Sequence, residues 1–262
     1  MANVRVEKEG AVVRLILSRP DKHNILNRAI FAELSAQLDE IAEQAAEDNI
    51  RVLVLAGEGP VFCAGQDLLE EEATKDGNAL RNLAERSINP VIRQLRALSL
   101  PVIASVTGVA AGAGITLALA CDLIIADEEA KFLPAFGKLG LSPVGGASYF
   151  LPRFLGHARA LGVCLTGEPI TGKQAEEWGL IWKAVPIADH SRFVQDLAVQ
   201  LAQAPTFAMA QIKEAINASF HHSLENQLRF ETELLARTGD SEDYREGRNA
   251  FIEKRPAKFW GR

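Results

Sequence analysis

The sequence has few of the residues that secreted, metal-binding or redox proteins use. Its three cysteines, Cys63, Cys121 and Cys164, are widely spaced and form no CxxC or Cys/His pattern. Scattered cysteines in odd number are typical of reduced thiols inside a cell rather than of a disulfide framework. The first residues, MANVRVEKEG, alternate charged and apolar side chains and contain no apolar run, so no signal peptide is expected. We therefore predict a cytoplasmic protein.

Common nucleotide and metal motifs are also missing. A dinucleotide-binding fingerprint that starts at Gly112-Ala113-Gly114 would need a glycine where Leu117 stands. No GxxxxGK[ST] or HExxH pattern occurs, and the histidines show no metal-ligand spacing. We therefore predict neither a bound metal nor a resident cofactor. The histidines are His23, His157, His190, His221 and His222.

Basic charge is scarce as well. The chain has 28 Lys and Arg against 34 Asp and Glu, which gives a net charge of −6 and a pI of about 5.5. This balance leaves no overall positive field and argues against a nucleic-acid or membrane partner. The uncharged segment from Ala97 to Cys121 imitates a membrane span, but it contains Pro101 and several glycines. A buried strand, a glycine turn and a buried helix explain it better.

What the chain does contain is an alternation of strand and helix patterns. VRVEKE and AVVRLILS predict two strands joined at Glu9-Gly10, and RVLVLAG, PVIASV and DLIIAD predict three more. Helical spacing follows Asn27 and returns over Leu80–Leu98, where Asn89-Pro90 predicts an interruption. Strands that alternate with helices indicate crossovers, so the pattern predicts an α/β fold with a mostly parallel sheet buried on both faces.

After about Gly145 the strand signals nearly vanish, apart from LIWKAV. We therefore expect an α/β core over residues 1–190 and a helical segment over residues 191–262. The aromatic residues of these last helices pack either on an oligomer interface or on the same subunit, and the pattern leaves both open. The predicted amphipathic helices are Ser191–Gln203, Pro205–Phe220, Ser223–Thr238 and Asp243–Lys254.

Two glycine turns are the strongest candidates for a site. Ala64–Asp67 follows the strand RVLVLAG, and Ala111–Gly114 follows PVIASVTGV. Each turn places free backbone N–H groups where a partial positive charge favours an anion. Two such turns after strands of one sheet could converge on a carbonyl oxygen and form an oxyanion hole. The alternative is that both turns only reverse the chain.

Several motifs together resemble the enoyl-CoA hydratase/isomerase (crotonase) superfamily. They are FCAGQDL, PVIASVTGVAAGAGITLALACDLIIA, FGKLGLSP followed by GG, LTGEPITGKQAEEWGLI and DYREGRNAFIEKR, and they span nearly the whole chain. The resemblance implies a ClpP-like spiral of ββα units whose C-terminal helices build a trimer or a dimer of trimers. Within the superfamily, AEEWGLIW and the GLSP turn look most like the isomerases of phenylacetate degradation and the Δ3,Δ2-enoyl-CoA isomerases.

The resemblance also assigns residues to the binding of an acyl-CoA thioester, with coenzyme A as part of the substrate. The amides of Gln66 and Ala113 match the two donors to the thioester carbonyl, in agreement with the two glycine turns. Ala64 and Gln66 lie in the CoA-binding loop of this pattern, and Lys22 and Lys254 match cations near the CoA nucleotide.

At the positions of the family's carboxylates this sequence departs from the pattern. Thr116 and Phe136 stand where hydratases carry two glutamates, and Val144 stands where isomerases carry their base. With Tyr149, these residues are expected to line the acyl pocket. A substitute proton carrier is sought among carboxylates beside the first glycine turn. The candidates are Asp67, Glu70, Glu71 and Glu72, followed by Tyr149, Glu176 and Glu177.

These observations predict an isomerase-like enzyme that stabilises a thioester enolate, acting on an enoyl-CoA or on a ring-epoxide of phenylacetyl-CoA. A hydratase or another thioester enzyme with unusual acid/base groups is the first alternative. A CoA-thioester-binding member with little catalysis is the second, because Thr116, Phe136 and Val144 replace the usual carboxylates. The sequence leaves the acyl group and the proton carrier open.

Overall fold

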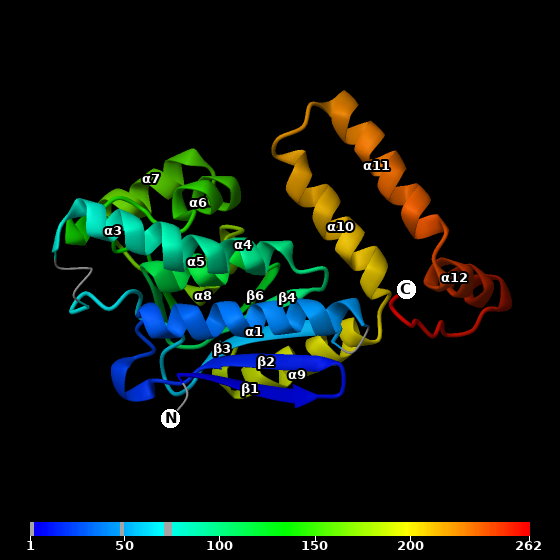
Figure 1. Cartoon of the computed structure of the whole chain (residues 1–262), viewed down its shortest axis with the longest axis horizontal. Helices are drawn as coiled ribbons and strands as arrows, with labels where there is room; N and C mark the ends of the chain where they lie inside the picture. The colour runs from blue at the N-terminus through cyan, green and yellow to red at the C-terminus, as the bar shows by residue number, and fades with distance from the viewer. Residues whose placement is uncertain (1–2, 48–49, 71–74) are drawn as a thin grey trace.

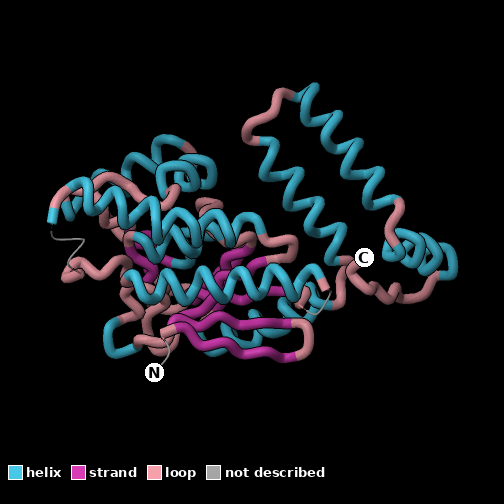
Figure 2. Tube along the Cα trace, in the orientation of Figure 1, coloured by secondary structure: helices cyan, strands magenta, loops and turns pink. Residues whose placement is uncertain are grey.

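The computed structural model describes residues 3–47, 50–70 and 75–262. It has two parts, a body in which helices cover a central sheet and a helical arm that leans away from it (Figure 1). Figure 2 shows the strands gathered between helices on both sides, as the predicted α/β pattern requires. The arm consists of α10 (Thr206–Ser219), α11 (Leu224–Gly239) and α12 (Glu242–Glu253).

The main sheet has the strand order β1-β2-β3-β4-β6-β9. Only β1 runs antiparallel to its neighbour, and it joins β2 through a turn at Gly10, which has a positive φ of 59°. The predicted N-terminal hairpin and the parallel sheet are both confirmed. The strands are β1 (Val4–Glu9), β2 (Val12–Leu17), β3 (Val52–Gly57), β4 (Val102–Val106), β6 (Leu123–Asp127) and β9 (Lys183–Val185).

Helices cover both faces of this sheet. On one face α1 (Arg28–Ala46), α4 (Asn89–Ala97) and α5 (Ala113–Ala120) pack into the larger apolar core. Asn27 caps α1 by accepting a hydrogen bond from the amide of Ile30 at 3.0 Å, which explains why the predicted helix starts there.

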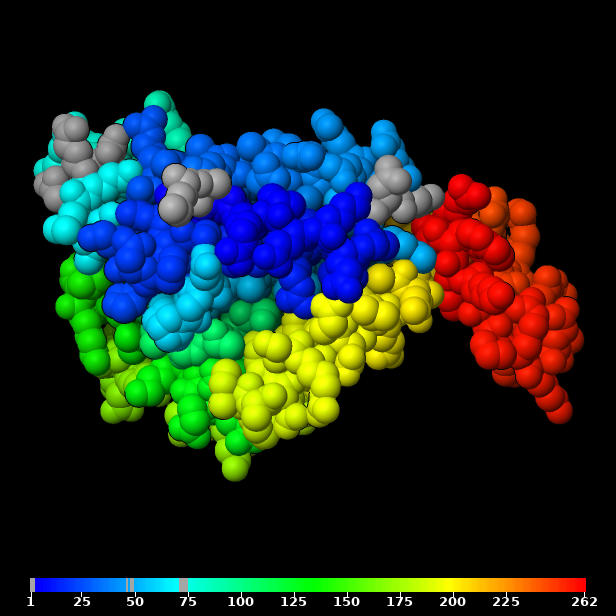
Figure 3. All heavy atoms as spheres, turned by 90° about the horizontal axis from the view of Figure 1, so that it is seen from below, coloured from blue at the N-terminus to red at the C-terminus, as the bar shows by residue number. Residues whose placement is uncertain are grey.

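The other face is covered by α9 (Ile187–Ala202), whose apolar side packs against the central strands. The predicted boundary between residues 190 and 191 falls inside this helix, and the helices that leave the body begin at Thr206. In Figure 3 the C-terminal residues project beyond the body at one end.

The predicted break in the helix over Leu80–Leu98 is a π-helical turn. α3 (Gly77–Leu83) continues into a π-helix, labelled η2 (Ala84–Ile88), and then into α4. Pro90 has no N–H, so it cannot donate to the carbonyl four residues earlier, and the amide of Asn89 bonds instead to the carbonyl of Ala84. The turn aims Ile88 into the body, where it is buried.

Smaller elements complete the body. A second sheet of order β5-β7-β8 stands beside the main sheet. Helices α6, α7 and α8 follow β7 in the chain. These elements are β5 (Val109–Ala111), β7 (Lys131–Leu133), β8 (Ile170–Thr171), α6 (Ala147–Leu155), α7 (His157–Thr166) and α8 (Gly172–Glu177), with 3-10 turns η1 (Pro20–Lys22) and η3 (Gly137–Leu139).

Hydrogen bonds tie the arm and the C-terminal tail to the body. Arg51, next to β3, donates to the hydroxyl of Thr206 at 2.7 Å and to the carbonyl of Phe259 at 3.1 Å. The buried carboxylate of Asp243 accepts the amides of Trp260 and Gly261 at 2.6 and 2.8 Å. These hydrogen bonds from the C-terminal tail therefore set the orientation of the arm relative to the body.

Candidate active site at two glycine turns

The two glycine turns that the sequence singles out touch each other. Gly65 has a positive φ of 100°, and a Cβ atom there would lie 2.8 Å from the carbonyl oxygen of Ala111 and 3.6 Å from the amide nitrogen of Ala113. A side chain at position 65 would therefore collide with the second turn. The backbones also pair directly, because Cys63 donates to Val109 at 3.0 Å and Ala111 donates to Cys63 at 2.9 Å.

Two amides at this contact are available to a ligand. Leu26 donates to the carbonyl of Gly65 at 2.7 Å, and Asp67 donates to the carbonyl of Leu26 at 2.8 Å, so the amide of Gln66 between them takes no part in this pairing. Ala113 is the first residue of α5, where an amide has no acceptor within the helix. Within residues 3–47, 50–70 and 75–262, neither amide donates to another group. The arrangement can bind a carbonyl oxygen that gains negative charge.

Thr116 lies one turn after Ala113 on α5, and its side chain is fully buried. Its hydroxyl is 3.2 Å from the carbonyl oxygen of Val144 and 3.4 Å from that of Gly112, and it can donate to either. The hydrogen bond from this hydroxyl to the carbonyl of Val144 holds the Val144 loop against α5, which begins at the second glycine turn.

The surface beside these residues is apolar. A Cβ atom at Gly145 would lie 2.9 Å from a methyl group of Ile88 and 3.0 Å from that of Thr116. Val144 packs against the main core, and Phe136 is 4% exposed within it. Thr116 and Val144 are thus brought together as expected, and neither they nor Phe136 offers a carboxylate.

The substitute proton carriers have other contacts. Asp67 accepts the amide of Leu69 at 3.1 Å, and Glu70 accepts the amide of Arg28, the first residue of α1, at 3.0 Å. Asp67 therefore caps its own loop, and Glu70 caps the start of α1. Glu71 and Glu72 lie outside the described residues.

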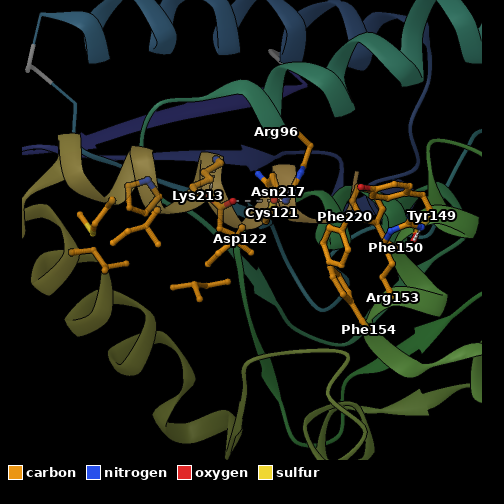
Figure 4. Close-up of a pocket in the computed structure, with 16 residues that line it drawn as sticks. Arg96, Cys121, Asp122, Tyr149, Phe150, Arg153, Phe154, Lys213, Asn217 and Phe220 are labelled. Carbon is orange, nitrogen blue, oxygen red and sulfur yellow. Dashed lines mark hydrogen bonds and ion pairs between the residues drawn. The ribbon is translucent and has the colours of Figure 1, made fainter. Parts of the chain in front are cut away.

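Of the other candidate carriers, two have polar partners and one is exposed. The hydroxyl of Tyr149 is 3.1 Å from Nε2 of His221, at the end of α10, so this side chain points toward the arm (Figure 4). Glu176 pairs with Lys183 at 2.7 Å and accepts the amide of Ala184 at 3.0 Å, and these partners lower the pKa of its carboxyl. Glu177 is exposed.

Cys63 lies at the contact between the turns but is not a nucleophile. Its side chain is fully buried, and burial raises the pKa of the thiol to about 12. At neutral pH almost no thiolate is present.

The residues expected near the CoA nucleotide are far apart within one chain. Lys22 is exposed on η1, in the loop whose His23 carbonyl accepts the amide of Ala64 at 3.0 Å. Lys254 is exposed just after α12. η1 and α12 lie at opposite ends of the molecule (Figure 1), so one chain cannot bring both lysines to one ligand.

Sequence reasoning missed a buried cluster of charges at the other end of α5. The carboxylate of Asp122, whose side chain is 19% exposed, lies 2.8 Å from the ammonium of Lys213 and 3.8 Å from the guanidinium of Arg96. Burial raises the pKa of this carboxyl in spite of the two cations. The only signal in the sequence is an acid that ends a long uncharged segment.

Two other predictions concern the whole chain. Among the described residues, no group of three or more His, Cys, Asp or Glu is placed to hold a metal ion. Within the same residues, no helix is both long enough and apolar enough to span a membrane.

The chain is similar to known proteins over nearly its whole length. Residues 7–262 match the family model described as Enoyl-CoA hydratase/isomerase. The chain is 44% identical over 256 residues to 1,2-epoxyphenylacetyl-CoA isomerase of Escherichia coli (strain K12), covering 97% of both chains. It is 35% identical to 2,3-dehydroadipyl-CoA hydratase of the same strain, covering 100% of both. Enoyl-CoA hydratase from Bacillus anthracis has a TM-score of 0.92 at 33% identity, with 99% of this chain and 100% of that chain covered.

Proposed function

The chain belongs to the enoyl-CoA hydratase/isomerase family and has the crotonase fold, and we propose that it is an isomerase-like enzyme whose substrate thioester binds at the two glycine turns. The thioester oxygen accepts hydrogen bonds from the amides of Gln66 and Ala113. The observation that supports this proposal is the close approach of Gly65, the residue before Gln66, to the turn at Ala113. Such donors stabilise the negative charge that develops on an enolate.

Of the two expected substrate classes, the site favours a ring-epoxide of an arylacetyl-CoA. Moving a double bond along an acyl chain carries a proton from one carbon to another, and Val144 offers no group that can do so. An epoxide fused to a ring diene can instead open to a seven-membered ring with no net transfer of a proton between carbons, so this reaction does not require a carboxylate at position 144. The similarity to the Escherichia coli 1,2-epoxyphenylacetyl-CoA isomerase supports this class.

One substitution removes one of the two proposed backbone donors. Ala113→Pro removes the amide hydrogen at the first position of α5, where proline fits the helix. We expect kcat to fall about 10²- to 10³-fold. Leu224→Pro is the matched control, because Leu224 is the exposed first residue of α11. Full activity in Ala113→Pro would overturn the assignment.

The alternatives predict different results with the same purified protein. Hydration of a 2-enoyl-CoA would favour the hydratase alternative, in line with the similarity to 2,3-dehydroadipyl-CoA hydratase. Tight acyl-CoA binding by calorimetry without turnover of enoyl or epoxide substrates would favour a binding protein. Absence of acyl-CoA binding would contradict all three functions.

We also propose that the CoA nucleotide binds between two copies of the chain, in a trimer or a dimer of trimers. Lys22 from one copy and Lys254 from another would then share one ligand. The exposed apolar residues on the outer helices of the arm, among them Leu228, Leu235 and Phe251, support such an interface. The division at residue 190 and the cytoplasmic location stay predictions.

Mixing two variants tests the shared site. Lys22→Ala and Lys254→Ala should each weaken acyl-CoA binding. Subunit exchange between them should recover part of the binding, because some sites then combine an intact Lys22 with an intact Lys254. If the lysines acted within one chain, mixing would recover nothing.

A further inference from the structure

The end of α12 holds a lysine in a backbone conformation that usually belongs to glycine. Lys254 follows Glu253, the last residue of the helix, and has a positive φ of 55°. Its amide donates to the carbonyl of Phe251 at 3.3 Å, and the amide of Arg255 donates to that of Ala250 at 3.0 Å. This pair of bonds is the Schellman motif, in which the chain reverses at a left-handed residue. The backbone here favours glycine, so a lysine points to a use for its side chain.

Glu246, on α12, clamps this reversal. Its two carboxylate oxygens accept hydrogen bonds from Nη1 and Nη2 of Arg255 at 2.6 and 2.8 Å, which makes a bidentate ion pair. One of these oxygens also accepts the amide of Lys258 at 2.9 Å. The partners lower the pKa of the Glu246 carboxyl to about 2, so it is ionised at neutral pH. Glu246 therefore ties the chain on the far side of Lys254 back to the helix.

The clamp leaves the charge of Lys254 for another partner. Arg255 is held by Glu246 and, at 2.6 Å, by Glu253. In the part of the chain that the structure describes, no carboxylate pairs with the exposed ammonium of Lys254. The local carboxylates thus occupy the neighbouring guanidinium, and the lysine can bind an anion from outside the chain, such as a phosphate.

The loop of the other lysine expected near the nucleotide is built in a similar way. Among residues 3–47, 50–70 and 75–262, the non-glycine positions with a positive φ besides Lys254 are His23 and Asn24, directly after Lys22. The side chain of Asn24 is fully buried and donates to the carbonyl of Glu58 at 2.9 Å. Each lysine therefore lies at a tight reversal that a polar side chain holds by hydrogen bonds.

We propose that Glu246 is a positioning residue for acyl-CoA, because it holds the reversal that presents Lys254 to the nucleotide bound on a neighbouring copy of the chain. This inference rests on the shared nucleotide site proposed above. A turn that is already fixed loses less conformational entropy when its lysine binds a phosphate, so affinity depends on the clamp as well as on the cation. Glu246 acts through Lys254 and not on the ligand itself.

Calorimetry with two ligands tests the inference on the full-length protein. Phenylacetyl-CoA and phenylacetyl-pantetheine share one thioester, and only the first carries the phosphorylated nucleotide. Glu246→Gln keeps the size of the side chain and breaks the ion pair with Arg255. We expect it to weaken phenylacetyl-CoA about fivefold and to leave phenylacetyl-pantetheine unchanged. Glu225→Gln is the matched control, because it breaks a Glu–Arg pair with Arg229 on α11, at 3.3 Å, and should keep the native affinity for both ligands.

A double variant separates positioning from a general structural role. In a Lys254→Ala background, Glu246→Gln should weaken phenylacetyl-CoA no further, because the lysine that it positions is gone. An additional loss in that background, or an equal loss for both ligands, would overturn the inference. So would native affinity in Glu246→Gln when Lys254→Ala alone weakens phenylacetyl-CoA.

Lys254→Ala on its own tests the premise. If it left the affinity for phenylacetyl-CoA unchanged, the shared site would fail and this inference would fail with it. Light scattering and thermal unfolding verify that each variant keeps the oligomeric state and the fold of the native protein.

Discussion

The hydroxyl of Thr116 lies 3.2 Å from the carbonyl oxygen of Val144 and joins the first turn of α5 to the loop before α6. The contact holds Val144 against α5, in the loop where related isomerases are expected to carry a base. It also commits the one buried hydroxyl there to the backbone. Neither Val144 nor Thr116 can therefore transfer a proton, and the site suits a substrate whose reaction needs no proton carrier at these two positions.

Val144→Asp should raise the rate of double-bond isomerisation, because Val144 offers no base. The new carboxylate would stand in the loop that Thr116 holds against α5, where the resemblance places the isomerase base, and could move a proton between carbons of a bound enoyl-CoA. We expect the rate of conversion of a 3-enoyl-CoA to a 2-enoyl-CoA, followed by absorbance, to rise at least 10²-fold. Val144→Asn is the control, since it has nearly the same shape without a transferable proton. Equal rates in the native protein and Val144→Asp would show that another group carries the proton.

Thr116→Val should destabilise the protein and loosen the Val144 loop. Valine keeps the shape of threonine but removes one of two donors to the carbonyl of Val144, which also accepts the amide of Ala147 at 3.3 Å, so the expected cost is about 0.5–1.5 kcal/mol. Urea unfolding measures the change. Thr232→Val is the control, because this exposed threonine on α11 makes a similar bond to the carbonyl of Leu228 at 2.9 Å. A loss as small as that of the control would mean that the hydroxyl does not hold the loop.

The three cysteines should differ in reactivity. Burial raises the pKa of all three thiols, but Cys63 and Cys121 are buried whereas Cys164 is partly exposed. We expect iodoacetamide at pH 8 to label Cys164 first, as followed by mass spectrometry of the intact and digested protein. Denatured protein, in which all three thiols react at similar rates, is the control. Fast labelling of Cys63 in the folded protein would contradict its placement.

His190 should make stability depend on pH. It is 2% exposed, its Nε2 lies 3.2 Å from the carbonyl oxygen of Ile125, and burial lowers its pKa from 6.5. The unfolded chain therefore binds the proton first as the pH falls. The contribution of His190 to stability is complete above pH 6.5 and is lost as the pH falls through the lowered value.

Urea unfolding at pH 8 and at pH 5.5 tests this behaviour. His190→Gln should lose part of the stability at pH 8 and show a smaller drop between the two pH values than the native chain. His157→Gln, at an exposed position on α7, should keep the native drop. If stability fell as much between pH 8 and pH 5.5 in His190→Gln as in the native protein, other titrating groups would cause the fall.

Much of the fold could be predicted because its causes are local. Asn27 marks the start of α1, Gly10 marks the first turn, and Pro90 forces the π-turn in the helix before it. Each of these effects depends on residues within a few positions of one another, so the order of residues is enough to reveal it.

The candidate site divides in the same way. The glycine turns at Gly65 and Gly112 could be read from the residues, and so could the change from carboxylate to Val144. The direction of Tyr149 toward His221 and the separation of Lys22 from Lys254 could not, because each depends on how the arm leaves the body.

The sequence by itself determined which backbone turns offer amides and which side chains lack a proton to transfer. Only the tertiary structure decided that Gly65 meets the turn at Ala113 and that Thr116 holds Val144. These relationships join residues far apart in the chain, and packing of the sheet and α5 sets their distances. Residue types define the available chemistry, and packing defines where it meets a ligand.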